Sequence, residues 1–415
     1  MGLDVGRQPV QDPDGVLQRP EGPVVVAHVL GGQERGGIMT HVLSLARQLD
    51  PARFALRSVV FRRGLETQLS EAGIATELIP KRGRSDATFL LRLAQHLRQM
   101  RPAIVHTHSV TSNLYGRVAA RLARVPVVIT TAHGFVGDIL RQNPSVPRLA
   151  AGPLALLDLK MSRLSDRLIT VSESIAADLV ARGVRREKVI AIPNGVEVSR
   201  FRLGLEARAA MRKALGVAPT EPLIGTVGSL IPLRNHALFL SAARRVLAEV
   251  PQARFAVVGD GSEGPRLREL AKELGIADRV IFTGERRDVP EVLSAFDIFA
   301  LSCDTEGFGL AALEAMAAGL PIVATRVGAL PELIEGEVSG VLVPPGDAPA
   351  LADALLRLLR ESETARRLGQ AARARAEASY SVERTAQQLS ELYLEVLERR
   401  GARRTGAPPG VGPRR

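Results

Sequence analysis

The sequence predicts an α/β protein made of two Rossmann-like domains that face each other across a cleft. A chain of 415 residues is too long for one ordinary core, and it suits two domains of ~150–200 residues. Short apolar segments of strand length alternate with amphipathic segments along most of the chain, which indicates parallel sheets covered by helices. A short helix and linker at 200–220 separate two such alternating sets, so we expect domains at 21–200 and 218–380.

The first domain opens with an apolar strand at 23–30, a glycine-rich loop at 31–37 and a helix at 39–49. Its further strands are predicted at 55–61, 75–80, 103–109, 126–134, 166–174 and 188–196, with helices at 65–73, 88–100 and 113–123. Residues 135–165 interrupt the alternation, because three prolines fall between Asn143 and Pro153. An apolar and basic helix is predicted at 153–168.

The second domain is predicted to hold six strands, and we expect its ligand beyond the carboxyl ends of those strands. The strands fall at 222–230, 253–260, 279–284, 297–302, 321–327 and 340–345, and two helices follow at 350–362 and 363–377. A last helix at 383–400 is expected to pack back on the first domain. Residues 1–20 and 401–415 are expected to be disordered tails.

Composition and charge narrow the class of protein. Hydrophobic residues make up 46% and charged residues 24%, so wholesale disorder is excluded. Cys303 is the one cysteine and cannot form an internal disulfide, no apolar run approaches the ~20 residues of a membrane span, and residues 1–20 lack the apolar core of a signal peptide. We therefore expect a cytoplasmic protein.

The net charge of +11 is carried by the first half of the chain. Residues 21–200 hold 25 basic and 14 acidic side chains, whereas residues 201–380 hold 21 and 23. This excess reflects either arginine-rich coding or a face that meets an anionic membrane, and both alternatives stay open for the helix at 153–168. Aromatic residues are 3%, Trp is absent and no zinc-finger motif occurs, so we expect no nucleic-acid partner.

Two glycine-rich segments follow strands of the second domain. GDGSEG (259–264) fits the dinucleotide-binding pattern G-x-G-x-x-G, and Glu285 lies 21 residues beyond Gly264. However, that pattern belongs to the first strand of a domain, and here 222–230 comes first, so a tight turn is the favoured interpretation. In the second segment, Glu306 and Glu314 flank a Gly-Phe-Gly turn at the start of a helix, where free backbone N–H groups suit a phosphate.

Together with the residues around it, the paired-glutamate segment resembles the retaining family-four glycosyltransferases, which have the GT-B fold of two Rossmann-like domains. The resemblance covers about residues 22–380. Its pieces are GGIMTHVLSLARQL (36–49), HTHS (106–109), TTAHG (130–134), ITVSES (169–174), IPNGVE (192–197), VGSLIPLRNH (227–236), VVGDGSEGPRLREL (257–270), VIFTG (280–284), the segment from Glu306 to Glu314, and GVLVPPGD (340–347).

The resemblance implies transfer of a sugar from a nucleoside-diphosphate sugar to a glycan or lipid-linked acceptor, with retention and without a metal or other cofactor. It implies that Glu306 binds hydroxyls of the donor sugar and that His133 lies beside the reacting anomeric carbon. Glu314 would bind the ribose, and 280–284 would line the base. The remaining donor-binding residues that it implies are Gly36, Gly37, Gly307, Phe308 and Gly309.

One position departs from the family pattern. The family usually carries Arg and Lys on the loop that begins at 227, and both bind the diphosphate. Here these positions are Ser229 and Arg234. Arg234 keeps a permanent charge and a forked geometry suited to phosphate, whereas Ser229 offers only a hydroxyl. A non-catalytic binder of nucleotide sugars is therefore a rival hypothesis, besides a sugar-nucleotide epimerase and an NAD-dependent oxidoreductase that uses GDGSEG.

Other reactive side chains fit structural roles better than chemical ones. His106 and His108 have a spacing that suits a metal, but no third ligand stands nearby, so we expect them to line the cleft. Cys303 lacks a histidine partner in its motif and is expected to be a small buried residue. Ser172 lies outside any G-x-S-x-G pattern, so the sequence gives no support to an esterase.

Overall fold

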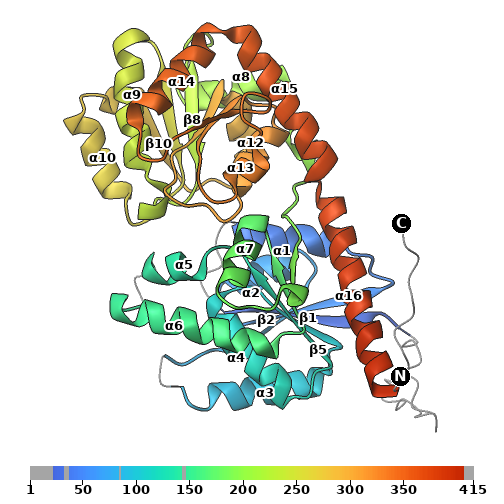
Figure 1. Cartoon of the computed structure of the whole chain (residues 1–415). Helices are drawn as coiled ribbons and strands as arrows, with labels where there is room; N and C mark the ends of the chain where they lie inside the picture. Colours follow the sequence, from blue (N-terminus) through green and yellow to red (C-terminus); the bar gives the residue numbers. More distant parts are fainter. Residues whose placement is uncertain (1–21, 32–36, 84–85, 143–145, 406–415) are drawn as a thin grey trace, which may run out of the picture.

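The computed structural model describes residues 22–31, 37–83, 86–142 and 146–405, which form two α/β domains (Figure 1). The first sheet has seven parallel strands in the order β3-β2-β1-β4-β5-β6-β7. Their bounds are β1 Val24–Leu30, β2 Phe54–Val60, β3 Ala75–Leu78, β4 Ile104–Thr107, β5 Val127–Ala132, β6 Arg167–Thr170 and β7 Val189–Ala191.

The second sheet has six parallel strands in the order β10-β9-β8-β11-β12-β13. Their bounds are β8 Leu223–Val227, β9 Arg254–Val258, β10 Val280–Gly284, β11 Ile298–Leu301, β12 Ile322–Thr325 and β13 Val341–Val343. The strand order reverses between β1 and β4 in the first sheet and between β8 and β11 in the second. In such sheets the ligand binds at this reversal, beyond the carboxyl ends of the strands.

Helices cover both faces of each sheet. In the first domain they are α1 Gly37–Gln48, α2 Leu65–Glu71, α3 Phe89–Met100, α4 Val110–Leu122, α5 Val136–Gln142, α6 Arg148–Met161 and α7 Glu173–Ala181. In the second they are α8 Leu205–Ala214, α9 His236–Glu249, α10 Gly264–Glu273, α11 Val289–Ala295, α12 Leu310–Ala317, α13 Leu330–Leu333, α14 Ala348–Arg360 and α15 Ser362–Ser379.

The last helix, α16 (Val382–Thr405), leaves the second domain and lies along the first (Figure 1). Tyr393 is fully buried on it, and Leu389 shares an apolar cluster with Val26 of β1. Burial of such side chains stabilises the docked helix by about 1.5–3 kcal/mol each. The chain thus crosses between the domains twice, and the two crossings are joined by a bridge between Val196 and Ser381.

A carboxylate also links the domains close to this crossing, where the hydroxyl of Tyr380 donates a hydrogen bond to the backbone oxygen of Glu332 at 3.1 Å. Glu332, at the start of the second domain's short helix α13, accepts hydrogen bonds from the backbone N–H groups of Glu173 at 2.8 Å and Ser174 at 2.7 Å. These N–H groups begin α7 in the first domain, where a helix dipole favours a negative charge. The contact holds the two carboxyl-end edges toward each other.

Two predicted helix boundaries were wrong. Helix α6 begins at Arg148 and ends at Met161, not at 153–168, so Pro153 lies inside it. The proline lacks the N–H that would bond to the carbonyl of Leu149, and its ring crowds that carbonyl, so it stands at an unfavourable position in the second turn of the helix. Beyond Met161 a short 3₁₀ turn (Ser162–Leu164) leads into β6, whose pairing with β5 and β7 takes precedence over helix propensity.

The predicted tail at 401–415 was also partly wrong, because α16 continues to Thr405. The segment after Gly401 is rich in Ala and Arg, which favour a helix, and one glycine costs only about 1 kcal/mol. Residues 406–415 and the predicted tail at 1–20 lie outside the described residues. Within the described part of the chain, no helix is both long and apolar enough to cross a membrane.

Candidate active site

The two domains meet where β5 of the first sheet and β11 of the second end. A Cβ atom on Gly307 would lie 2.6 Å from the backbone oxygen of His133 and 2.8 Å from the Cα of Gly134. Only glycine permits this approach. On the same seam, Thr305 donates a hydrogen bond from Oγ1 to Oδ2 of Asp138 at 3.3 Å. The structure therefore brings the predicted residues His133 and Gly307 together from opposite domains.

Glu306 lies at the centre of this junction, and its carboxylate is held in place from several sides. It is 8% exposed and forms an ion pair with the guanidinium of Arg234. It also accepts a hydrogen bond from the backbone N–H of Phe308 at 3.3 Å, and its own backbone oxygen accepts one from Ala329 at 3.0 Å. These contacts fix the carboxylate before any ligand binds.

The helix that follows presents an uncapped N-terminus to the same place. Gly309 precedes α12 with φ +94°, a conformation that glycine adopts without strain. Because glycine has no side chain, it cannot cap the first N–H groups of the helix, and these groups together with the helix dipole attract an anion. A phosphate bound here would lie within the same loop as Glu306.

Glu314 lies on α12 itself and is half-buried. Burial raises the pKa of its carboxyl to about 7, and the positive charge of Arg200 opposes this shift. A carboxyl with this pKa is partly protonated at neutral pH. Hydroxyl groups that donate hydrogen bonds to the carboxylate would stabilise its charged form.

Ser229 and Arg234 both lie in the loop after β8, but they differ in exposure to solvent. Ser229 is exposed, whereas Arg234 is half-buried in a short turn (Pro232–Arg234) and also contacts Sγ of Cys303 at 3.5 Å. Cys303 is 1% exposed, as expected for a small buried residue. Of the two positions that carry cations in the family, Arg234 is therefore the one that supplies charge beside Glu306.

The first two glycines of GDGSEG (259–264) are explained by packing. A Cβ on Gly259, whose φ is +137°, would lie 2.0 Å from the backbone oxygen of Gly228, and a Cβ on Gly261 would lie 2.3 Å from that of Leu230. The turn thus packs against the backbone on both sides of Ser229. This close approach accounts for Gly259 and Gly261 without a dinucleotide.

The glycine-rich loop of the first domain contributes little that can be described. Gly36 lies outside the described residues, and Gly37 is the first residue of α1. The implied contact of both glycines with the donor stays a prediction.

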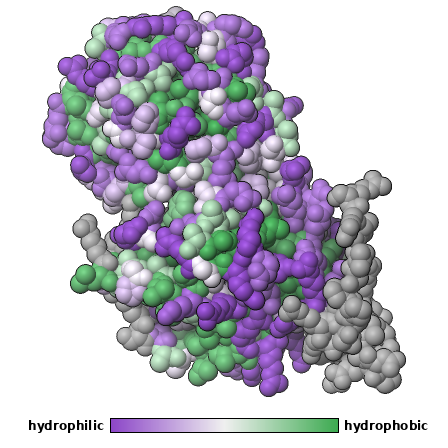
Figure 2. Space-filling view, viewed as in Figure 1, coloured by the Kyte–Doolittle hydropathy of each residue, from purple (hydrophilic) through white to green (hydrophobic). Residues whose placement is uncertain are grey.

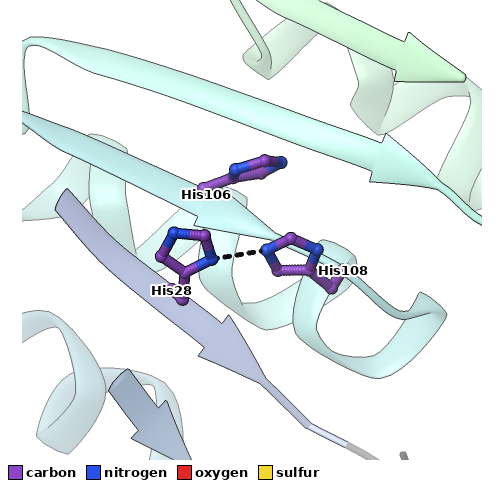
Figure 3. Close-up of side chains that lie close together, drawn as sticks. All are labelled: His28, His106 and His108. Carbon is purple, nitrogen blue, oxygen red and sulfur yellow. Dashed lines mark hydrogen bonds between the residues drawn. The ribbon is translucent and has the colours of Figure 1, made fainter. Parts of the chain in front are cut away.

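The expectation that His106 and His108 line the cleft was wrong. They are 0% and 1% exposed and form a buried cluster with His28 (Figure 3). His28 and His106 are direct neighbours in the β1–β4 pairing. Burial lowers the pKa of all three imidazoles, that of His28 to about 3 with a further contribution from His41.

Sequence reasoning missed His28 and His41, although a signal existed. His28 falls near the end of the first strand and His106 near the end of another strand, and neighbouring parallel strands bring such positions together. His41 reaches the same place from α1, with its ring 5.3 Å from that of His133. Strand order, which a single sequence does not show, was needed to see this.

Comparison with known proteins identifies the family. Residues 207–375 match the family model "Glycosyl transferases group 1", and residues 35–200 match "Glycosyltransferase Family 4". Over 309 residues the chain is 37% identical to a D-inositol 3-phosphate glycosyltransferase of Saccharomonospora viridis, covering 71% of this chain and 70% of the relative. The chain belongs to the family-four glycosyltransferases.

Other relatives of this glycosyltransferase extend over nearly the whole chain. It is 26% identical to UDP-Gal:alpha-D-GlcNAc-diphosphoundecaprenol alpha-1,3-galactosyltransferase of Escherichia coli, covering 90% of this chain and 97% of the relative. Anabaena Alr3699/HepE in complex with UDP-glucose has a TM-score of 0.80 at 22% identity, covering 89% of this chain and 99% of the neighbour. The glycosyltransferase has the GT-B fold and uses a nucleotide-sugar donor, and these matches give no support to an epimerase or an oxidoreductase.

Proposed function

We propose that this glycosyltransferase binds the donor diphosphate between Arg234 and the N-terminus of α12, with the sugar between Glu306 and His133. The observation that carries the proposal is the junction at Gly307, which brings His133 of one domain against the loop of Glu306 from the other. Glu314 would bind the ribose through its hydroxyls, and β10 (280–284) would line the base. Departure of the diphosphate and attack by the acceptor on the same face would retain the anomeric configuration.

A thermal-shift panel of UDP, GDP, ADP and NAD, without metal, tests the donor site. A ligand that binds only the folded protein raises its melting temperature by mass action. We expect a shift with one nucleoside diphosphate, and UDP is the first candidate because the relative from Escherichia coli is named for UDP-Gal. A shift with NAD alone would contradict the proposal and would favour dinucleotide binding at residues 259–264.

Metal-free chemistry is the first prediction from this site. The negative charge on a leaving nucleoside diphosphate would be stabilised by the guanidinium of Arg234 and by the first N–H groups of α12, which act as fixed donors. We expect transfer to continue at the same rate after dialysis against a chelator. The measurement is the initial rate with and without added Mg²⁺ or Mn²⁺, and strict dependence on either would contradict the prediction.

The carboxyl of Glu314 predicts a pH-dependent affinity for the donor. Its pKa of about 7 means that it is mostly charged at pH 8 and mostly neutral at pH 6. Ribose hydroxyls donate to the charged form, so affinity should be highest above pH 7 and fall by up to about tenfold from pH 8 to pH 6.

Affinity should be measured with the intact nucleotide sugar, whose diphosphate is esterified at both ends and does not titrate near pH 7. The Glu314→Gln variant is the control, because its amide cannot ionise. Its affinity should be weaker at pH 8 and flat with pH. An equal slope in both proteins would assign the dependence to another group.

For the acceptor, we propose a lipid-linked molecule at an anionic membrane. Helix α6 is anchored by a buried ion pair between Asp158 and Arg117 at 2.8 Å. Its outer face carries Leu149, Leu156 and Leu157, which are 95%, 51% and 44% exposed. Figure 2 shows an apolar protrusion where α6 begins, on the domain that holds the excess of positive charge. Apolar side chains that protrude from a basic domain can insert at an anionic lipid interface, where the positive charge is attracted to the headgroups.

Vesicle sedimentation tests this contact. Leu149→Glu should lower binding to phosphatidylglycerol vesicles several-fold, because it places a negative charge in the apolar face. Leu205→Glu is the matched control, since Leu205 is 84% exposed on α8 in the other domain. Equal binding by both variants would favour a water-soluble acceptor, such as the D-inositol 3-phosphate named for the relatives.

A further inference from the structure

Three histidines form a hydrogen-bonded chain from the buried sheet to the cleft. Nδ1 of His28 lies 2.8 Å from Nε2 of His108 (Figure 3), and Nδ1 of His108 lies 3.3 Å from Nε2 of His133. His28 and His108 are 2% and 1% exposed, whereas His133 is half-buried at the domain junction. The chain therefore ends at the ring that we place beside the donor sugar.

Each ring in this chain is neutral and carries one proton. Burial lowers the pKa of all three, with further lowering by neighbouring imidazoles. The other rings that face them are His41, whose pKa burial lowers to about 4, and His106, whose ring centre is 4.1 Å from that of His108. His106 is itself neutral and is engaged by the hydroxyls of Tyr393 at 2.6 Å and Thr131 at 2.7 Å.

With one proton on each ring, the two hydrogen bonds allow two directions. In the inward direction, His133 donates to His108 and His108 donates to His28. The proton of His28 then lies on Nε2 as a buried N–H, yet this atom has no partner among the described residues. If they point outward, the same atom is only an unpaired acceptor. Buried N–H groups without a partner are rare and costly, so the outward direction is favoured.

We propose that His28 and His108 are positioning residues that fix His133 as the tautomer with its proton on Nδ1. His28 donates from Nδ1 to His108, and His108 donates from Nδ1 to Nε2 of His133. Because Nε2 of His133 is occupied as an acceptor, the ring offers an N–H donor to the cleft. Its target is a hydroxyl of the donor sugar or a phosphate oxygen, and this last step rests on the proposed function.

A metal site is the main alternative for this cluster. The candidate ligand atoms of His28, His106 and His108 lie within 4.8 Å of one another. However, five of their six ring nitrogens already form hydrogen bonds with side chains, and the sixth is the unpartnered Nε2 of His28. A metal would have to break these bonds, so the hydrogen-bonded chain explains the geometry better.

Long-range ¹H–¹⁵N NMR of the full chain labelled at histidine tests the proposal without relying on activity. The protonated ring nitrogen gives a pyrrole-like ¹⁵N shift and the bare nitrogen a pyridine-like one. We expect His133, assigned by the loss of its signals in His133→Gln, to be neutral with its proton on Nδ1. A proton on Nε2, or a charged ring at neutral pH, would overturn the proposal.

The same sample distinguishes the metal site. Addition of one equivalent of Zn²⁺ should leave the ring signals unchanged. A joint change in the signals of His28, His106 and His108 would show that they bind metal and would overturn the proposal. Both NMR results can be obtained even if the protein transfers no sugar. A failure of the proposed histidine hydrogen bonds can therefore be distinguished from a failure of the proposed function.

Two variants of His108 test whether the hydrogen-bonded histidines affect the rate of transfer. The amide of His108→Asn can stand near the position of Nδ1 and donate to His133, whereas His108→Leu removes the donor. We expect His108→Leu to lower kcat about three- to tenfold with little change in the donor KM. His108→Asn should retain most of the rate. Equal rates in both variants, with melting temperatures near that of the native protein, would contradict the positioning role.

Discussion

Replacing Glu306 by glutamine is expected to lower kcat by about two to three orders of magnitude. Glutamine keeps the shape of the side chain but removes the charge that pairs with Arg234. It also weakens the acceptor for hydroxyls of the donor sugar as positive charge develops at the anomeric carbon. Initial rates at saturating donor, with product detected directly, give the measurement.

Stability must be measured beside the rate, because Glu306 is nearly buried. Arg234 has a side chain that is 31% exposed, so solvent can take over part of the lost pairing and the melting temperature should change little. Glu363→Gln is the matched control, since it also removes a carboxylate paired with an arginine, Arg366, but on the outer surface. A Glu306→Gln enzyme with full activity would remove this residue from the mechanism.

Replacing Arg234 by alanine is expected to weaken donor binding about 10- to 100-fold, which corresponds to one lost hydrogen-bonded charge. The effect should be large because Ser229 stands where the family usually has a second cation, so no charge at that position compensates. Isothermal titration with the nucleoside diphosphate measures the change. Arg234→Lys should keep part of the affinity, since it retains the charge but not the forked geometry.

Two further variants make the test of the diphosphate site selective. Arg266→Ala removes an exposed arginine of α10 that pairs with Glu263, and it should leave the affinity for the nucleoside diphosphate unchanged. Ser229→Arg restores the cation of the family pattern at an exposed position and should tighten binding. If Arg234→Ala bound the nucleotide normally, the diphosphate would lie elsewhere.

Much of the fold could be predicted because its signal is local. Strands such as β1 and β8 are mostly apolar runs bounded by turns, and the described strands fall inside the predicted ranges except that β2 begins one residue earlier, at Phe54. The boundaries of α6 were wrong because the pairing of β6 and the anchoring of Asp158 by Arg117 decide where that helix ends and which face it buries. Both are contacts with distant parts of the chain.

The candidate site also combines features that are local in sequence with contacts between distant residues. Glu306 and Glu314 could be singled out because they and the glycines between them lie within one segment, and their separate roles came from the resemblance that this segment carries. The ion pair with Arg234, the packing of Gly307 on His133 and the histidine chain all join residues far apart in sequence. They became visible only when strand order and domain contact were known.

The most direct test of the account is a crystal structure of the protein with the nucleoside diphosphate that the thermal-shift panel selects. The account predicts that the β-phosphate contacts Arg234 and the first N–H groups of α12, with the ribose hydroxyls on Glu314. A nucleotide bound instead at the turn of 259–264, with Arg234 still paired only to Glu306, would contradict it.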